Sequence, residues 1–205
     1  MEMPPVIYVE FIEREAGIPR EIFRYIGDQS ASWVQAEQDR YIGQLGRTMR
    51  LGPHPAYLTL FRIDGLHRID DWERYFRSDA YHDNYRSFAM QRSLRMLRDG
   101  CYDELVPTEQ IGDGIYYLEY FHPPDGAADS ALVDHYRQQS EHHPDARLVL
   151  LLRRIGYLAP DPGGLVAWCF PTGRAAEPML RERTTDSKFR PTDAGLYRRF
   201  GEEIP

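Results

Sequence analysis

Apolar and polar residues follow one another in the same order twice along this chain. Alternating or continuous apolar segments rich in β-branched and aromatic residues predict β-strands. These segments are 6–12, 44–51, 56–63 and 102–108, and then 115–121, 147–156, 165–170 and 189–192. Apolar residues at helical spacing predict amphipathic helices over 19–39, 70–96, 130–141 and 174–183, with Gly100 closing the second. Each half therefore has the order β-α-β-β-α-β.

The repeat also shows in the letters of the sequence. Residues 7–12 (Ile-Tyr-Val-Glu-Phe-Ile) match 116–121 (Tyr-Tyr-Leu-Glu-Tyr-Phe), and 105–109 match 189–193. A repeat this long indicates two copies of one supersecondary unit. The order of elements is that of a ferredoxin-like unit, a four-stranded antiparallel sheet with two helices on one face.

The strands are apolar on both faces, so each sheet needs cover on the side that its helices leave bare. Two copies in one chain provide this cover if the sheets come together and curl into a barrel with the helices outside. The predicted fold class is α+β: two tandem ferredoxin-like repeats, 1–110 and 111–205, whose antiparallel sheets form an α/β barrel.

Three motifs resemble a known family. They are Gly-Ile-Tyr-Tyr-Leu-Glu-Tyr at 114–120, Pro-Pro-Asp-Gly at 123–126, and Leu-Ala-Pro-Asp-Pro-Gly-Gly-Leu-Val-Ala-Trp at 158–168. With them, the chain resembles the dimeric α/β-barrel superfamily as a covalent tandem, and within it NIPSNAP-type domains. Where that family has an arginine in its first strand, this chain has Phe11 or Tyr120. The superfamily includes cofactor-independent monooxygenases, heme-dependent enzymes, muconolactone isomerases and stress-response binding proteins, so the resemblance implies a small-molecule ligand.

Composition narrows the class of partner and compartment. The 205 residues carry a net charge of −7 and no basic run, so neither nucleic acid nor an anionic membrane is an expected partner. Cys101 and Cys169 stand alone, as free thiols do in a reducing compartment. The sequence shows neither the pattern of a signal peptide nor a long apolar segment, so we expect no signal peptide, no membrane span and a cytoplasmic protein. Lys188 is the only lysine, a usage typical of a GC-rich bacterial genome, and the family resemblance favours a homodimer over a monomer.

Two glutamates occupy the same position in the two opening strands, Glu10 and Glu119. A carboxylate on a strand buried on both faces is costly unless it is paired. One interpretation is a general base whose pKa is raised by burial. The other is an ion pair with an arginine of a neighbouring strand, such as Arg62 or Arg154.

Aromatic residues surround these positions. Tyr8 and Tyr117 lie two residues before the glutamates on the same strand face, where they would orient a substrate or serve as core residues with a tethered hydroxyl. Trp72 and Trp168 are expected near the cavity walls, where each would present a flat apolar surface to a ring-shaped ligand or simply pack in the core.

Among the histidines, His135 is the strongest candidate, because it shares a helix face with Leu132 and Tyr136. It would act as a base, bind heme iron axially, or form a hydrogen bond in the core. His82 has a similar setting in the first half. No group of ligands with metal-site spacing is evident, so we expect no metal.

No nucleophile elbow, P-loop or dinucleotide fingerprint occurs in the sequence. The main hypothesis is a small-molecule enzyme that works without a cofactor, by oxygenation or isomerisation of an aromatic or polyketide-like substrate. Glu119 or His135 would remove a proton and Tyr117 would hold the developing oxyanion. The alternatives are a non-catalytic NIPSNAP-like binding or structural protein and a heme-binding barrel, so enzymatic activity stays open.

Overall fold

The computed structural model describes residues 5–14, 40–48, 55–79, 94–156, 158, 163–183 and 191–199. These residues form eight strands and four helical segments. The strands are β1 (Val6–Arg14), β2 (Arg40–Arg47), β3 (Tyr57–Ile63), β4 (Leu94–Val106), β5 (Ile115–Phe121), β6 (Arg147–Arg154), β7 (Gly164–Phe170) and β8 (Pro191–Arg199). The helical segments are the 3-10 helix η1 (Leu66–Arg68) and the α-helices α2 (Ile69–Phe76), α5 (Asp129–His142) and α6 (Gly173–Glu182).

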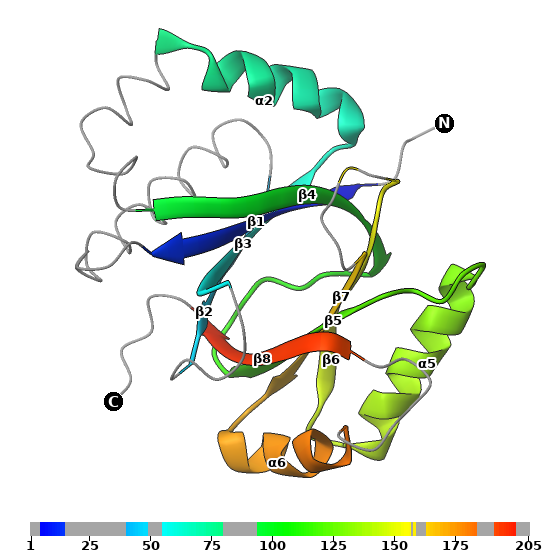
Figure 1. The fold of residues 1–205 in the computed structure, drawn as a ribbon. Coiled ribbons are helices and arrows are strands. Elements are labelled where there is room, and N and C mark those ends of the chain that lie inside the picture. Colours follow the sequence, from blue (N-terminus) through cyan, green and yellow to red (C-terminus); the bar gives the residue numbers. More distant parts are fainter. Residues whose placement is uncertain are drawn as a thin grey trace.

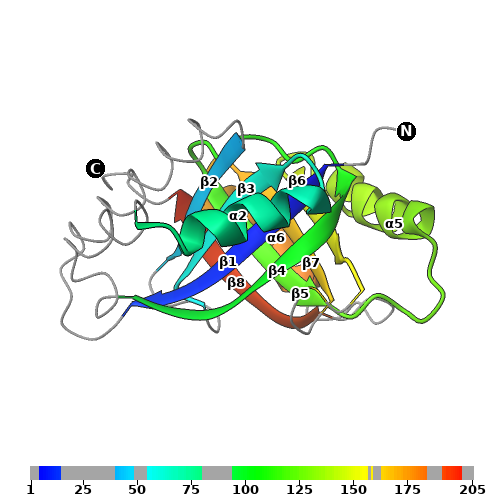
Figure 2. The ribbon, with the colours of Figure 1, turned by 90° about the horizontal axis from the view of Figure 1, so that it is seen from above.

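The strands close into one antiparallel barrel in the order β1-β3-β2-β8-β5-β7-β6-β4 (Figures 1 and 2). Strands of the first half are ordered β4-β1-β3-β2 and those of the second half β8-β5-β7-β6. The two sets join where β2 pairs with β8 and β4 pairs with β6. The predicted α+β barrel is confirmed, and its closure removes the open sheet edges that would otherwise invite association.

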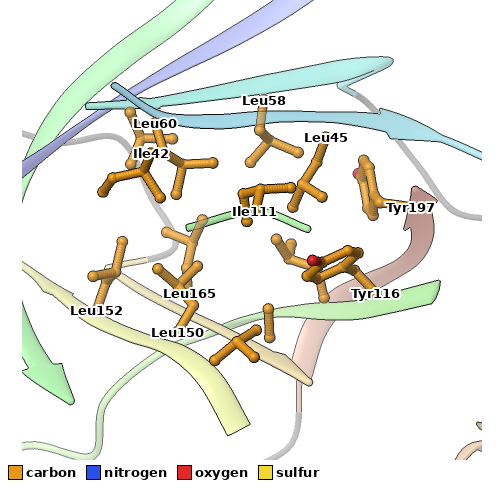
Figure 3. Packing of buried hydrophobic residues seen from close by; sticks show 14 of the residues in the cluster. Ile42, Leu45, Leu58, Leu60, Ile111, Tyr116, Leu150, Leu152, Leu165 and Tyr197 are labelled. Carbon is orange, nitrogen blue, oxygen red and sulfur yellow. The ribbon is translucent and has the colours of Figure 1, made fainter. Parts of the chain in front are cut away.

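Strand alternation separates the core into an inner and an outer layer. On β5, Tyr116, Leu118 and Tyr120 belong to the inner cluster of buried apolar residues. Figure 3 shows Tyr116 in this cluster with Leu45 of the first half and Leu150 of the second. Tyr117 and Phe121 point outward and pack under α5 and α6. Because side chains alternate along a strand, the outward Glu119 lies in this second layer.

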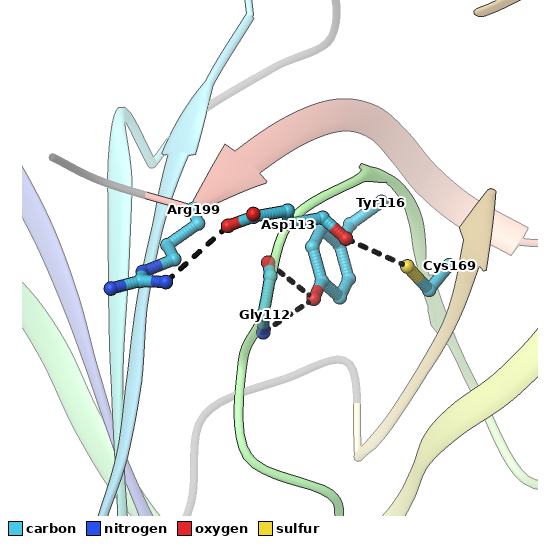
Figure 4. Close-up of polar contacts among 5 residues, drawn as sticks. All are labelled: Gly112, Asp113, Tyr116, Cys169 and Arg199. Atoms are coloured by element: carbon cyan, nitrogen blue, oxygen red, sulfur yellow. Dashed lines mark hydrogen bonds and ion pairs between the residues drawn. The ribbon is translucent and has the colours of Figure 1, made fainter. Parts of the chain in front are cut away.

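The segment between the halves is held by short-range polar contacts (Figure 4). The backbone N–H of Gly112 donates to the hydroxyl of Tyr116 at 2.9 Å, and that hydroxyl donates to the Gly112 carbonyl at 2.8 Å. Asp113 contacts Arg199 across 3.3 Å, while its carbonyl accepts from the Cys169 thiol at 3.8 Å. These contacts fix the start of β5 against β7 and β8.

The strands predicted at 6–12, 56–63, 115–121, 147–156 and 165–170 and the helices predicted at 130–141 and 174–183 are confirmed within a few residues. The helix predicted over 70–96 is wrong at its end, because α2 stops at Phe76 and 94–96 already belong to β4. Gly100 therefore lies inside β4 and not at a helix end. Pairing of β4 with β1 along nine positions satisfies the backbone there, and tertiary pairing overrides local helical spacing.

The last strand is also longer than predicted, since β8 continues to Arg199 where a tail was expected from 194 onward. The match between 105–109 and 189–193 does not reflect equivalent positions: β4 ends at Val106, whereas β8 begins at Pro191. The helix predicted over 19–39 lies outside the described residues. Within those residues, no helix is long and apolar enough to cross a membrane.

Candidate functional site

The glutamate of the second half is buried in an ion pair. Arg183, directly after α6, donates from Nε to Glu119 Oε1 at 2.7 Å and from Nη2 to Oε2. Their side chains are 4% and 0% exposed, and the guanidinium lies 5.6 Å from the centroid of the Trp168 ring. The ion-pair interpretation of Glu119 therefore describes its environment, with Arg183 as the partner in place of Arg62 or Arg154.

Aromatic rings fill the space around this pair. Tyr117 stacks on Trp168 at 6.0 Å between centroids, and Tyr136 of α5 meets Trp168 at 5.7 Å and Phe121 at 5.1 Å. Burial, reinforced by the charge of Glu119, raises the pKa of Tyr117, so its hydroxyl keeps its proton. The indole Nε1 of Trp168 is buried with no hydrogen-bond acceptor among the described residues.

His135 lies at the edge of this aromatic layer. It is half-buried on α5, and its ring meets the ring of Tyr136 edge-on at 4.9 Å. The structure thus brings Tyr117, Glu119 and Trp168 together and places His135 beside them. Their catalytic and ligand-binding roles stay predictions, because this geometry is also that of a packed layer between sheet and helices.

A cavity of about 350 Å³ lies on the outer face of the first half, between β1, β3 and β4 on one side and α2 and Leu158 on the other. Its volume falls within the range of small-molecule sites. Ile69 and Leu158 stand at its wall with 38% and 51% of their surface exposed, and they are the large exposed hydrophobic residues of the described chain. The described lining consists of Tyr8, Ile63, Ile69, Glu73, Arg77, Asp99, Gly100, Cys101 and Leu158.

The polar side of the cavity is acidic. The hydroxyl of Tyr8 donates to Asp99 Oδ2 at 2.6 Å, and Asp99 is the β4 partner of Glu10. Burial and then the nearby Asp99 charge raise the pKa of Glu10 from 4.5 to about 7. The same two causes raise the pKa of the Cys101 thiol to about 11. Burial, followed by the charge of Glu10, raises the pKa of Tyr8. Tyr8 and Cys101 therefore keep their protons near neutral pH, while Glu10 titrates there.

The two halves place equivalent residues in register. Tyr8 pairs with Phe61 on β3, as Tyr117 pairs with Trp168 on β7, and Glu10 occupies the position of Glu119. The difference is in the third strand. Glu10 faces a second carboxylate, Asp99 on β4, whereas Glu119 faces Ala194 on β8 and pairs with Arg183. Among the described residues, neither Glu10 nor Asp99 forms an ion pair. The carboxyl groups of the first half thus lack the cationic partner that Glu119 has in the second half.

Two predicted site residues have no described side chain. Trp72 lies in α2, where the structure describes only its backbone, and His82 lies outside the described residues. Sequence reasoning missed Asp99 and Arg183. Asp99 was missed because the sequence pattern predicted that its segment forms the end of a helix. Arg183 follows Glu119 by 64 positions, a separation that no local pattern reveals.

Neither protein-family models nor curated protein sequences gave a match to this chain. A comparison with solved structures did give matches. A mutant chlorite dismutase from Candidatus Nitrospira defluvii, in complex with cyanide, has a TM-score of 0.57 at 10% identity, over 97% of this chain and 92% of that one. A heme-binding protein from Thermus thermophilus has a TM-score of 0.56 at 12% identity, over 95% and 91%. The likeness establishes the fold type, and the resemblance to NIPSNAP-type domains stays a prediction.

These neighbours correct one prediction. We expected no cofactor, with heme as a lesser alternative, and that expectation is wrong because a protein of the same fold binds heme. The likenesses show neither oxygenation nor isomerisation of an aromatic substrate, so those activities stay predictions.

The described residues were then compared with what heme requires, an axial ligand beside a flat apolar slot. In the second half, His135 supplies an imidazole, but the rings of Tyr136, Trp168 and Tyr117 contact one another where a macrocycle would lie. The described lining of the first-half cavity holds no histidine, and the hydroxyl of Tyr8 there already donates to Asp99. The residues as arranged in the described part of the chain do not fit heme.

Proposed function

We propose that this protein is a small-molecule-binding barrel whose ligand occupies the first-half cavity. The observation that carries the proposal is the cavity itself, with its apolar wall of Ile63, Ile69 and Leu158 and its polar pair of Tyr8 and Asp99. Ligand sites combine a mostly apolar concave surface with a few polar groups that orient the ligand. Exposed Ile69 and Leu158 are costly in water unless something covers them.

The second half serves as the structural half in this proposal. The Glu119–Arg183 pair and the stacked Tyr117 and Trp168 occupy the space that corresponds to the first-half cavity. We also propose that 1–110 and 111–205 are duplicated ferredoxin-like units related to NIPSNAP-type domains. The shared strand order and the equivalent Tyr-x-Glu positions support this relationship.

If the site is catalytic, Glu10 is better placed than Glu119 to accept a proton. Its pKa of about 7 suits proton transfer at neutral pH, whereas both side-chain oxygens of Glu119 already accept hydrogen bonds from Arg183. Catalysis by Glu119, His135 and Tyr117, and association as a homodimer, stay as further parts of the hypothesis.

The test is a fragment screen on the purified, isotopically labelled protein. We expect fragments to shift the amide resonances of Gly100 and Cys101, while the indole resonance of Trp168 stays in place. The double variant Ile69→Ser/Leu158→Ser should weaken the same fragments at least about ten-fold, since it removes the two exposed apolar contacts. Shifts concentrated around Trp168 and Tyr136, unaffected by that variant, would contradict the proposal.

Heme is the second candidate ligand, favoured by the heme-binding protein among the fold neighbours. The absorption spectrum of freshly purified protein, and of protein mixed with hemin and passed through a desalting column, tests it. A Soret band that His135→Ala abolishes would assign heme to the second half and require its aromatic layer to open. A protein that remains colourless after both treatments would leave the cavity ligand as the function.

A further inference from the structure

The first-half cavity carries its own indication of ligand charge. Asp99 is exposed at its wall, accepts one hydrogen bond from Tyr8, and has no cationic partner among the described residues. Glu10 lies next to Asp99 across the β1–β4 ladder and has none either. The one basic side chain of the described lining, Arg77, pairs with Glu73 one turn earlier on the helix.

The described part of the cavity therefore presents negative charge beside an apolar wall. An anionic ligand placed there would meet like charges. A ligand with a cationic group could instead donate to Asp99, and a charge-assisted hydrogen bond of this kind is about twice as strong as a neutral one. Tyr8 adds an aromatic ring next to the same carboxylate, and ring faces attract organic cations.

The second half shows what a cation does at the equivalent place. There the guanidinium of Arg183 bonds Glu119 and lies over the ring of Trp168, the register partner of Tyr117. The first half has the corresponding glutamate and aromatic pair, Glu10 with Tyr8 and Phe61, and an additional carboxylate. Arg77 follows α2 as Arg183 follows α6, but it pairs with Glu73, so among the described residues no arginine bonds Glu10 or Asp99.

We propose that the ligand of the first-half cavity is an organic cation, an apolar molecule carrying a protonated amine. Its ammonium group donates to Asp99 in the position that Arg183 takes in the other half, and its apolar body lies against Ile63, Ile69 and Leu158. This inference rests on the proposed ligand-binding function of the cavity and specifies the class of ligand.

The experiment uses matched probes that differ only in their polar group. Phenethylamine, cyclohexylmethylamine and hexylamine are each compared with the corresponding alcohol and carboxylate, by resonance shifts at Gly100 and Cys101. We expect each amine to bind about ten-fold more tightly than its alcohol, a difference of about 1.4 kcal/mol, and each carboxylate to bind least. Asp99→Asn should remove most of that preference, Glu10→Gln part of it, and the exposed control Asp125→Asn none.

The outcomes separate this inference from the proposed function. An amine preference that is lost in Asp99→Asn and kept in Asp125→Asn supports the inference. Amines and alcohols that bind equally at Gly100 and Cys101 overturn the inference and leave the binding function in place. Probes that shift neither resonance, while fragments bind around Trp168, overturn both. Because Asp99 is exposed, the amide substitution should leave folding intact, and a thermal melt of each variant checks this.

Discussion

Removal of Arg183 should be among the most damaging single changes outside the apolar core. Arg183→Met keeps an unbranched side chain without the guanidinium and leaves Glu119 buried without a cation. The two side chains are 4% and 0% exposed, so water cannot replace the lost partner. Breaking a buried pair by removing one member costs about 3–5 kcal/mol. The contact of the guanidinium with the Trp168 ring is lost as well.

The chain provides a matched control in the last turn of α6, two residues before Arg183. Arg181 pairs with Glu177 at i,i+4, with 77% and 54% of these side chains exposed. Exposed helix pairs contribute about 0.3–0.5 kcal/mol, so Arg181→Met should change stability about ten-fold less in free energy. Substituting both members, as in Glu119→Leu/Arg183→Met, removes the unpaired charge and should recover most of the loss, since apolar replacement of a buried pair is often neutral.

The assay is denaturant unfolding of the wild type, the two single variants, Glu119→Leu and the double variant. For a domain of this size, a loss of 3–5 kcal/mol lowers the melting temperature by roughly 10 °C. The coupling energy between Glu119 and Arg183 should reach about 3 kcal/mol in the double-mutant cycle. An Arg183→Met protein that is no less stable than Arg181→Met would refute the reasoning, because the pair would then be solvated.

Three further predictions concern the first half and its junction. Glu10→Gln should stabilise the protein by roughly 1–3 kcal/mol near pH 8 and leave its stability unchanged near pH 4. The reason is that the pKa of Glu10 rises from 4.5 to about 7 on folding, so Glu10 contributes less to stability as the pH rises through this window. Unfolding curves at the two pH values check this, and equal effects at both would contradict it. Gly43→Ala should lower the free energy of unfolding by about 2–4 kcal/mol, because Gly43 has φ 145° and an added methyl group would overlap Ile111. The control Gly112→Ala has open space around the added methyl group and should be near neutral in the same unfolding experiments. Iodoacetamide should alkylate Cys101 slowly at neutral pH and faster toward its pKa of about 11, and a bound amine should protect it, as mass spectrometry of the labelled peptide would show.

The candidate site was predictable in part. The repeated Tyr-x-Glu motif located Glu10 and Glu119 on equivalent strand faces, because side-chain alternation needs only the local pattern. The pattern could not tell which glutamate is neutralised. That depends on Arg183, which reaches Glu119 because α6 returns across β5 and β7. It also depends on Asp99, whose segment has helical spacing but pairs as a strand.

The sequence by itself determined the apolar strands, the duplicated order of elements and the need for a barrel, since short-range periodicity sets which faces avoid water. The tertiary structure decided that the first half has a cavity and that the second half has packed side chains at the corresponding place. Closure of the sheet brings β4 beside β1 and places Asp99 next to Glu10, while α6 brings an arginine to the corresponding glutamate of β5. Two strands that share a Tyr-x-Glu motif thus acquire different chemistry, because charges separated by tens of residues in sequence meet only in the folded protein.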